Sequence, residues 1–130
     1  MMILTLRTDN PKAEIGLFDG ETQLAYETWE AQRELAATLH SKIKALLEGQ
    51  GRTYADIGGI VCFEGPGSFT GLRIGITVAD TFAYSFSKPI VAAGGDDWAK
   101  TGIRKLLAGE NDRIALPSYG APAHVTAPRS

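Results

Sequence analysis

One glycine-rich segment of this chain contains residues whose types and spacing could form a binding site. It runs Gly65-Pro66-Gly67-Ser68-Phe69-Thr70-Gly71-Leu72-Arg73-Ile74-Gly75, between an expected strand and an expected helix. Such a loop can bind phosphate, because the amides and the dipole of the helix point at it. It is not a Walker loop, which needs lysine and then serine or threonine after its last glycine. Nor does its glycine spacing match the dinucleotide fingerprint, so we favour a structural role over a phosphate site.

Small residues recur every four positions through the same segment. The row consists of Gly67, Gly71, Gly75, Ala79 and Ala83. Positions four apart lie on one face of a helix, so this face carries almost no side chains. Glycine inside a helix costs about 1 kcal/mol relative to alanine, which indicates that another element packs very close. That element could be the domain's own sheet, a neighbouring helix or another subunit.

The other reactive residue types lack partners at a useful spacing. His40 falls in a lysine-containing helix and suits a solvated position, and His124 has no second metal ligand nearby. Cys62 lies in an apolar strand without a neighbouring histidine, so it suits packing better than nucleophilic attack. Ser68 and Thr70 suit capping of the helix start. We find no convincing catalytic centre and no metal site.

Composition limits the class of protein further. The chain has 130 residues with 44% hydrophobic residues, one cysteine and a net charge of -2. That size suits one domain, and the apolar fraction argues against a disordered tail protein. A protein that binds nucleic acid through its own charge is usually basic, so any RNA is expected on another subunit. No secretory or membrane-spanning segment is visible, and we expect a cytoplasmic protein.

Periodicity places these residues on a series of strands and helices. Three strands are expected first, at 2–6, 13–18 and 23–29, with Asp19-Gly20 as a hairpin turn. A helix follows from about Ala31 to Gly49, with Leu35, Leu39, Ile43, Leu46 and Leu47 on one stripe. Next come a strand at 57–63, a helix at 68–87, a strand at 89–93 and a helix capped by Asp96 or Asp97.

The order β-β-β-α-β-α-β-α predicts a mixed α/β sheet covered by helices, within one lobe. We assign residues 1–110 to this lobe. Residues 111–130, with Pro117, Pro122 and Pro128, are expected to form an extended tail that is ordered only if it docks.

The run from residue 65 to residue 75 resembles the signature of the bacterial TsaB family, also called YeaZ. The resemblance covers about residues 2–95 and is most specific in that motif, which comprises Gly65, Pro66, Gly67, Ser68, Phe69, Thr70, Gly71 and Arg73. It implies a lobe of the actin, sugar kinase and Hsp70 ATPase (ASKHA, ribonuclease H-like) fold. It also implies a non-catalytic partner of the paralogous enzyme TsaD, acting with the ATPase TsaE. Together these proteins place a threonylcarbamoyl group on the adenosine next to the tRNA anticodon.

Three features depart from the family pattern. Arg7-Thr8 stands where the first strand usually runs into Asp-Thr, and that aspartate belongs to the metal and phosphate apparatus of the fold. Leu35-Ala36 replaces a His-Ser pair. Only one short helix precedes residues 116–126, which resemble the family's terminal Pro-x-Tyr run ending in Val-Thr. We therefore expect a shortened form without most of the second lobe, without a cofactor of its own, and with any ATP bound by partner subunits.

The resemblance also implies an interface made by amino-terminal helices. In this interpretation, the interface with the partner is formed by Leu35, Leu39 and Ile43 and by the row of Gly67, Gly71, Gly75, Ala79 and Ala83. We expect a bulky residue at Gly75 or Ala79 to abolish complex formation while the monomer stays folded. The alternative function is a small ATP-binding or hydrolytic, glycoprotease-like protein that uses the Gly65–Gly71 loop. A third possibility is a homodimer through the same helices when the partner is absent.

Overall fold

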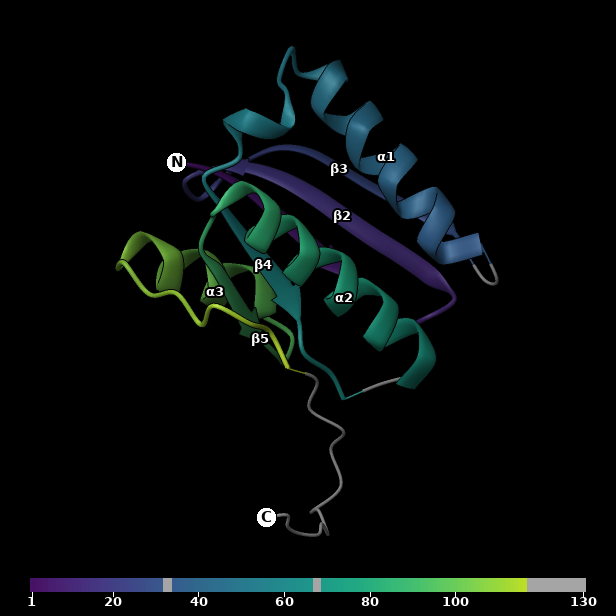
Figure 1. Ribbon diagram of the computed structural model, residues 1–130. Coiled ribbons are helices and arrows are strands. Elements are labelled where there is room, and N and C mark those ends of the chain that lie inside the picture. Colours follow the sequence, from purple (N-terminus) through teal and green to yellow (C-terminus); the bar gives the residue numbers. More distant parts are fainter. Residues whose placement is uncertain (32–33, 67–68, 117–130) are drawn as a thin grey trace, which may run out of the picture.

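The computed structural model describes residues 1–31, 34–66 and 69–116. One mixed sheet contains β1 (Met2–Arg7), β2 (Lys12–Asp19), β3 (Thr22–Glu30), β4 (Gly59–Phe63) and β5 (Ile90–Ala93). The strand order across the sheet is β3-β2-β1-β4-β5. β2 runs antiparallel to β1 and β3, whereas β1, β4 and β5 are parallel to one another (Figure 1). The predicted five-stranded mixed sheet is confirmed.

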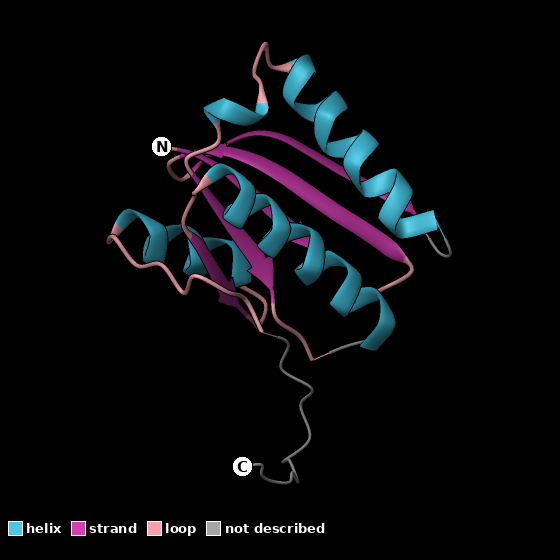
Figure 2. Cartoon of the chain, in the orientation of Figure 1, coloured by secondary structure: helices cyan, strands magenta, loops and turns pink. Residues whose placement is uncertain are grey.

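Helices cover both faces of this sheet. They are α1 (Leu35–Gly49), α2 (Phe69–Phe86) and α3 (Trp98–Leu107), and a short 3-10 helix, η2 (Tyr54–Asp56), precedes β4. α1 and α2 lie on one face and α3 lies on the other, which gives three layers (Figure 2). The predicted alternation of strands and helices is confirmed, although η2 was not among the expected elements.

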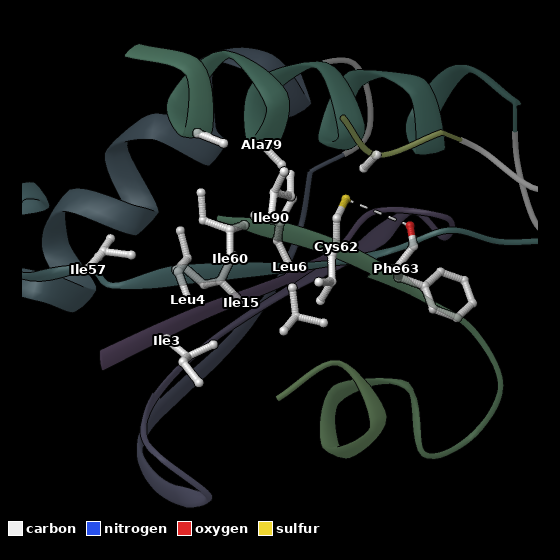
Figure 3. Close-up of a cluster of buried hydrophobic side chains, with 14 of the residues drawn as sticks. Ile3, Leu4, Leu6, Ile15, Ile57, Ile60, Cys62, Phe63, Ala79 and Ile90 are labelled. Carbon is white, nitrogen blue, oxygen red and sulfur yellow. Dashed lines mark hydrogen bonds between the residues drawn. The ribbon is translucent and has the colours of Figure 1, made fainter. Parts of the chain in front are cut away.

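The side chains of β4 alternate between these two layers of helices. Ile60 and Cys62 point toward α2, whereas Phe63 points to the opposite side (Figure 3). There the Phe63 ring meets the edge of Trp98 in α3, with ring centroids 5.7 Å apart. Val61 also faces α3, where its side chain contacts Gly102. Because both faces are covered, every residue of β4 is buried, as its uninterrupted apolar sequence predicts.

The turn between β2 and β3 is the predicted hairpin. Gly20 has a φ of +59°, which glycine adopts at little cost, and Asp19 pairs with Thr22 across the turn. Leu17 pairs with Ala25 and Phe18 with Gln23, so Leu24 is an extra residue in β3. The pairing of β3 with β2 is therefore irregular near the start of β3, and it is regular over Ala25–Glu30.

The start of α1 differs from the sequence prediction, whereas the start of α3 agrees with it. α1 begins at Leu35 rather than near Ala31, because the Ala31 amide donates to the carbonyl of Pro11 at 3.0 Å and extends the strand connection. Asp97 is the N-cap residue of α3, as predicted, but its side chain makes no capping hydrogen bond. A tertiary contact thus shifts the start of α1 from the position that its sequence pattern predicts.

The segment after α3 packs on the domain as far as the structure describes it. Asn111 and Asp112 bond to β5, and the amide of Ala115 donates to Asp80 Oδ1 in α2 at 2.7 Å. Ala115 is buried. The division of the chain at residue 110 stays a prediction, and residues 117–130 of the expected tail at 111–130 lie outside the described residues. Across the described ranges, no helix is long and apolar enough to cross a lipid bilayer.

Candidate functional site

The glycine loop follows β4 directly and is shaped by backbone packing. Gly65 has a φ of +106°, a conformation that favours glycine, and the Gly65–Pro66 peptide bond is cis. A Cβ at Gly94 would lie 3.0 Å from the carbonyl oxygen of Gly65, so the loops after β4 and β5 nearly touch. Gly67 and Ser68, both in the family motif, lie outside the described residues. Backbone conformation and close packing therefore explain the glycine at position 65.

The first turns of α2 are fastened to the end of β1. Thr8 Oγ1 donates a hydrogen bond of 2.7 Å to the carbonyl oxygen of Gly71. Gly75 lies directly on Thr8, and any Cβ at this position would overlap the threonine side chain. Thr8 itself is 2% exposed. The close neighbour of the helix at Gly75 is thus the domain's own sheet, one of the three possibilities that the sequence left open.

The other members of the small-residue row that the structure describes, Gly71, Ala79 and Ala83, also face inward. Ala79 and Ala83 are buried in the main core, and Gly71 is half-buried. This packing predicts that a bulky residue at Gly75 or Ala79 destabilises the monomer itself, contrary to the expectation from the sequence. Such a side chain would have to displace β1 or the core beneath α2 before it met any partner.

The three expected interface residues of α1 also lie inside the domain. Leu39 and Ile43 belong to the main core, and Leu35 packs in a smaller cluster with Ala13 and Ala31. All three are at most 5% exposed. Their apolar spacing is the core-facing stripe of an amphipathic helix. A partner protein would therefore contact other side chains of α1.

The outward face of α2 is the surface that the sequence analysis missed. Its exposed positions are Thr70, Arg73, Thr77, Thr81, Tyr84, Ser85 and Phe86, of which the first five follow helical spacing. One of these seven residues is charged, whereas an exposed helix face of a monomeric protein usually carries several charges. The sequence contains the pattern that identifies this face, because these weakly charged positions lie between the members of the small-residue row.

The neighbouring helix α1 continues this weakly charged surface. Between its buried positions it exposes Ala36, Ala37, His40, Ser41 and Ala45, with Lys44 and Glu48 toward its end. α3, on the other face of the sheet, differs, because Lys100, Arg104 and Lys105 lie within its ten residues. Depletion of charge marks the centre of protein–protein interfaces. We call the outward faces of α1 and α2 together the helical surface.

Aromatic residues stand at one end of the helical surface. Tyr84 is 89% exposed, and Phe86 is also exposed. Phe86 stacks with Tyr54 of η2, and Phe82 completes the group with its ring centroid 4.7 Å from that of Phe86. Burial raises the pKa of the Tyr54 hydroxyl, and the nearby Glu48 raises it further. Tyrosine is among the residue types that dominate binding energy at interfaces, which singles out Tyr84.

The polar groups at the end of β1 form a closed ion pair. Arg7 Nε lies 2.7 Å from Asp9 Oδ1, and the guanidinium stacks over the Phe63 ring, 3.9 Å from its centroid. The hydrogen bond that Arg7 donates to the Asp9 carboxylate raises the pKa of Arg7. A paired cation thus occupies the position where the family pattern places a carboxylate.

The remaining candidates do not converge on a reaction centre. Cys62 is buried beneath α2, and burial raises the pKa of its thiol, which leaves it a poor nucleophile. His40 is exposed on α1, and His124 lies outside the described residues. Within residues 1–31, 34–66 and 69–116, no three His, Cys, Asp or Glu side chains are placed to hold a metal ion.

Comparisons with known proteins agree on one family. A family model described as "TsaD: tRNA N6-adenosine threonylcarbamoyltransferase" matches residues 29–93. The tRNA threonylcarbamoyladenosine biosynthesis protein TsaB of Bacillus subtilis (strain 168) is 34% identical over 92 residues, covering 71% of this chain and 40% of that protein. TsaB of Escherichia coli (strain K12) is 28% identical over 121 residues, covering 88% of this chain and 52% of that protein.

A solved structure supports the same assignment. YeaZ from Pseudomonas aeruginosa superposes with a TM-score of 0.68 at 25% identity, over 81% of this chain and 49% of that one. The fold is accordingly a ribonuclease H-like lobe of the ASKHA type. This chain spans about half the length of the curated relatives it matches, or less. On sequence and on structure, the chain belongs to the TsaB (YeaZ) family.

Proposed function

We propose that this chain acts in tRNA threonylcarbamoyladenosine biosynthesis as a non-catalytic subunit that binds a TsaD-like enzyme. The names of the two curated relatives support the pathway, and the TsaD-type family model supports kinship with the enzyme itself. A TsaE-like ATPase and the tRNA would join through the complex. The net charge of -2 is consistent with tRNA being held by another subunit.

The observation that carries this proposal is the helical surface. A continuous, weakly charged area on α1 and α2, with the exposed Tyr84 at its end, suits burial against another protein. The predicted interface residues Leu39, Gly75 and Ala79 act beneath it. By fixing both helices to the sheet, they set the relative position of the side chains that meet the partner.

A pair of matched variants tests the proposal. Thr77 lies in the middle of the helical surface, and Thr101 is exposed on α3, across the sheet. Each is changed to lysine, and the chain is co-expressed with the TsaD-like protein of the same organism. Complexes are then analysed by size-exclusion chromatography with light scattering. We expect wild type and Thr101→Lys to form a heterodimer and Thr77→Lys to lose about tenfold or more of it, because a buried unpaired charge is costly.

Two results would contradict this proposal. Equal complex formation by Thr77→Lys and Thr101→Lys would exclude the helical surface as the interface. Low-micromolar binding of Mg-ATP to the chain alone, measured by calorimetric titration, would instead favour the alternative of a small ATP-binding protein. We expect no such binding, because Arg7 and Asp9 neutralise each other at the end of β1.

A further inference from the structure

The two edge strands of the sheet, β5 and β3, differ in how their outer backbone groups are hydrogen-bonded. On the outer side of β5, the amides of Ile90 and Ala92 donate to Asn111 Oδ1 at 3.1 Å and to Asp112 Oδ2 at 2.9 Å. The Asp112 amide donates to the Ile90 carbonyl at 2.8 Å, and Lys105 Nζ donates to the Ala92 carbonyl at 3.2 Å. The backbone groups on this edge are therefore already satisfied within the chain.

The opposite edge of the sheet is β3, whose outer side has no backbone partner among the described residues. This strand has nine residues, and among the described residues its backbone pairs with β2 alone. α1 reaches β3 through side chains: Trp29 Nε1 donates to Thr38 Oγ1 at 3.0 Å, and Lys42 Nζ lies 2.6 Å from Glu27 Oε2. These side chains lie on one face of the sheet, so in the described part of the chain they do not cover the backbone edge. Such an edge presents unpaired amides and carbonyls to another strand.

The features of β3 that can protect an edge strand leave its second half available for pairing. The strand contains neither proline nor lysine, and its irregular residue, Leu24, lies near its start. Its charged residues are Glu27 and Glu30, and Glu27 is already paired with Lys42 of α1. The regular part, Ala25–Glu30, exposes Tyr26, Thr28 and Glu30 on the face that α1 does not cover. This stretch is therefore suited to pairing with a further strand.

We propose that β3 pairs antiparallel with β3 of a second copy of this chain, with the two-fold axis at Thr28. Directly opposed residues must point to the same face, so the axis of such a pair passes through a residue. An axis at Glu27 would oppose two carboxylates, and an axis at Tyr26 would bring the irregular Leu24 into the ladder. With the axis at Thr28, Tyr26 faces Glu30 of the second copy and Glu27 faces its Trp29.

Charge complementarity supports this register. Lys42 lies over the Trp29 ring, 5.7 Å from its centroid, as well as beside Glu27. Because Glu27 of one copy faces Trp29 of the other, each Lys42 comes near a glutamate of both copies. The carboxyl-terminal residues 117–130 are a poorer occupant of the edge, because their three prolines lack the amide donor that a ladder needs. The proposal uses the sheet edge and does not depend on the helical surface.

Single cysteines on β3 test both the pairing and its register. The natural Cys62 is buried, so an introduced exposed cysteine is the reactive one. Under mild oxidation of the full chain, we expect Thr28→Cys to form covalent dimer about tenfold faster than Tyr26→Cys or Glu30→Cys alone. Opposed strand residues lie within disulfide reach, whereas cysteines two residues off the axis are about 13 Å from their equivalents. Mixing Tyr26→Cys with Glu30→Cys should restore the crosslinking.

Three outcomes would overturn the proposal. The first is equal crosslinking at Tyr26, Thr28 and Glu30. The second is wild-type protein that stays monomeric in light scattering at increasing concentration, which needs no variant. The third is loss of the Thr28→Cys dimer when Thr77→Lys is added, since this would assign self-association to the helical surface. Retention of that dimer in the double variant would support pairing at the edge.

Discussion

α2 and α3 pack on opposite faces of the same sheet by the same device, yet their outer surfaces differ. Gly75 brings α2 onto Thr8, and Gly102 brings α3 onto Val61, in both cases without room for a Cβ. Away from the sheet, α3 carries cations, whereas α2 exposes threonines and Tyr84. The comparison shows that a buried glycine in a helix indicates close packing of the helix on the sheet. Whether the helix also binds another protein has to be inferred from the composition of its exposed side.

We expect the largest effect, a loss of stability, from replacing the glycines that let the two helices pack closely on the sheet. Gly75→Leu and Gly102→Leu should each lower the free energy of unfolding by about 3 kcal/mol or more, because the new side chain must displace a strand residue. Urea denaturation measures this. Gly49→Leu is the control, since nothing lies within 4 Å of a Cβ there, and its effect should stay within about 0.5 kcal/mol. A stable Gly75→Leu protein would show that α2 is not held against β1.

The next effect separates the two outer surfaces. Tyr84→Ala should weaken binding to a TsaD-like enzyme about tenfold or more, because an exposed tyrosine at an interface is a frequent anchor. Leu107→Ala on α3, which removes a side chain that is 46% exposed, should leave affinity unchanged. Calorimetric titration with the enzyme compares the two variants. Equal losses would mean that the helical surface has no special role.

The smallest effect concerns the one carboxylate of α2. Partial burial raises the pKa of Asp80 above its ordinary value of 3.8, while the hydrogen bond from the Ala115 amide opposes this. A raised pKa means that the folded state holds the proton more tightly. Stability therefore falls as the pH rises from 3.8 through the folded pKa.

Asp80→Asn keeps an oxygen for the Ala115 amide and removes the titration. The variant should be at least as stable as wild type at pH 7, and its loss of stability between pH 4 and pH 7 should be smaller. Thermal unfolding across this range gives the comparison. A variant with the pH dependence of wild type would assign that dependence to other carboxylates.

The sequence predicts the arrangement of elements well because their signals are local. Asp19-Gly20 specifies a turn by backbone geometry, and the unbroken apolar run of β4 specifies a strand covered on both faces. The neighbour of the small-residue row could not be predicted in the same way. Spacing by four identifies one face of a helix, but the rotation of α2 about its axis depends on Thr8, more than sixty residues earlier in the chain. Likewise, Asn111 and Asp112 follow no period, so nothing local pairs them with β5.

The hydrogen bonds between β5 and residues Asn111 and Asp112 also determine the order in which the two sheet edges are completed during synthesis. The hairpin of β2 and β3 leaves the ribosome early, with its outer edge already in final form. The β5 edge stays bare until the chain has been extended through residue 112 and can fold back. A nascent chain that pauses between these points carries two unsatisfied edges instead of one. Its exposure to aggregation is therefore greatest just before α3 and the segment behind it emerge.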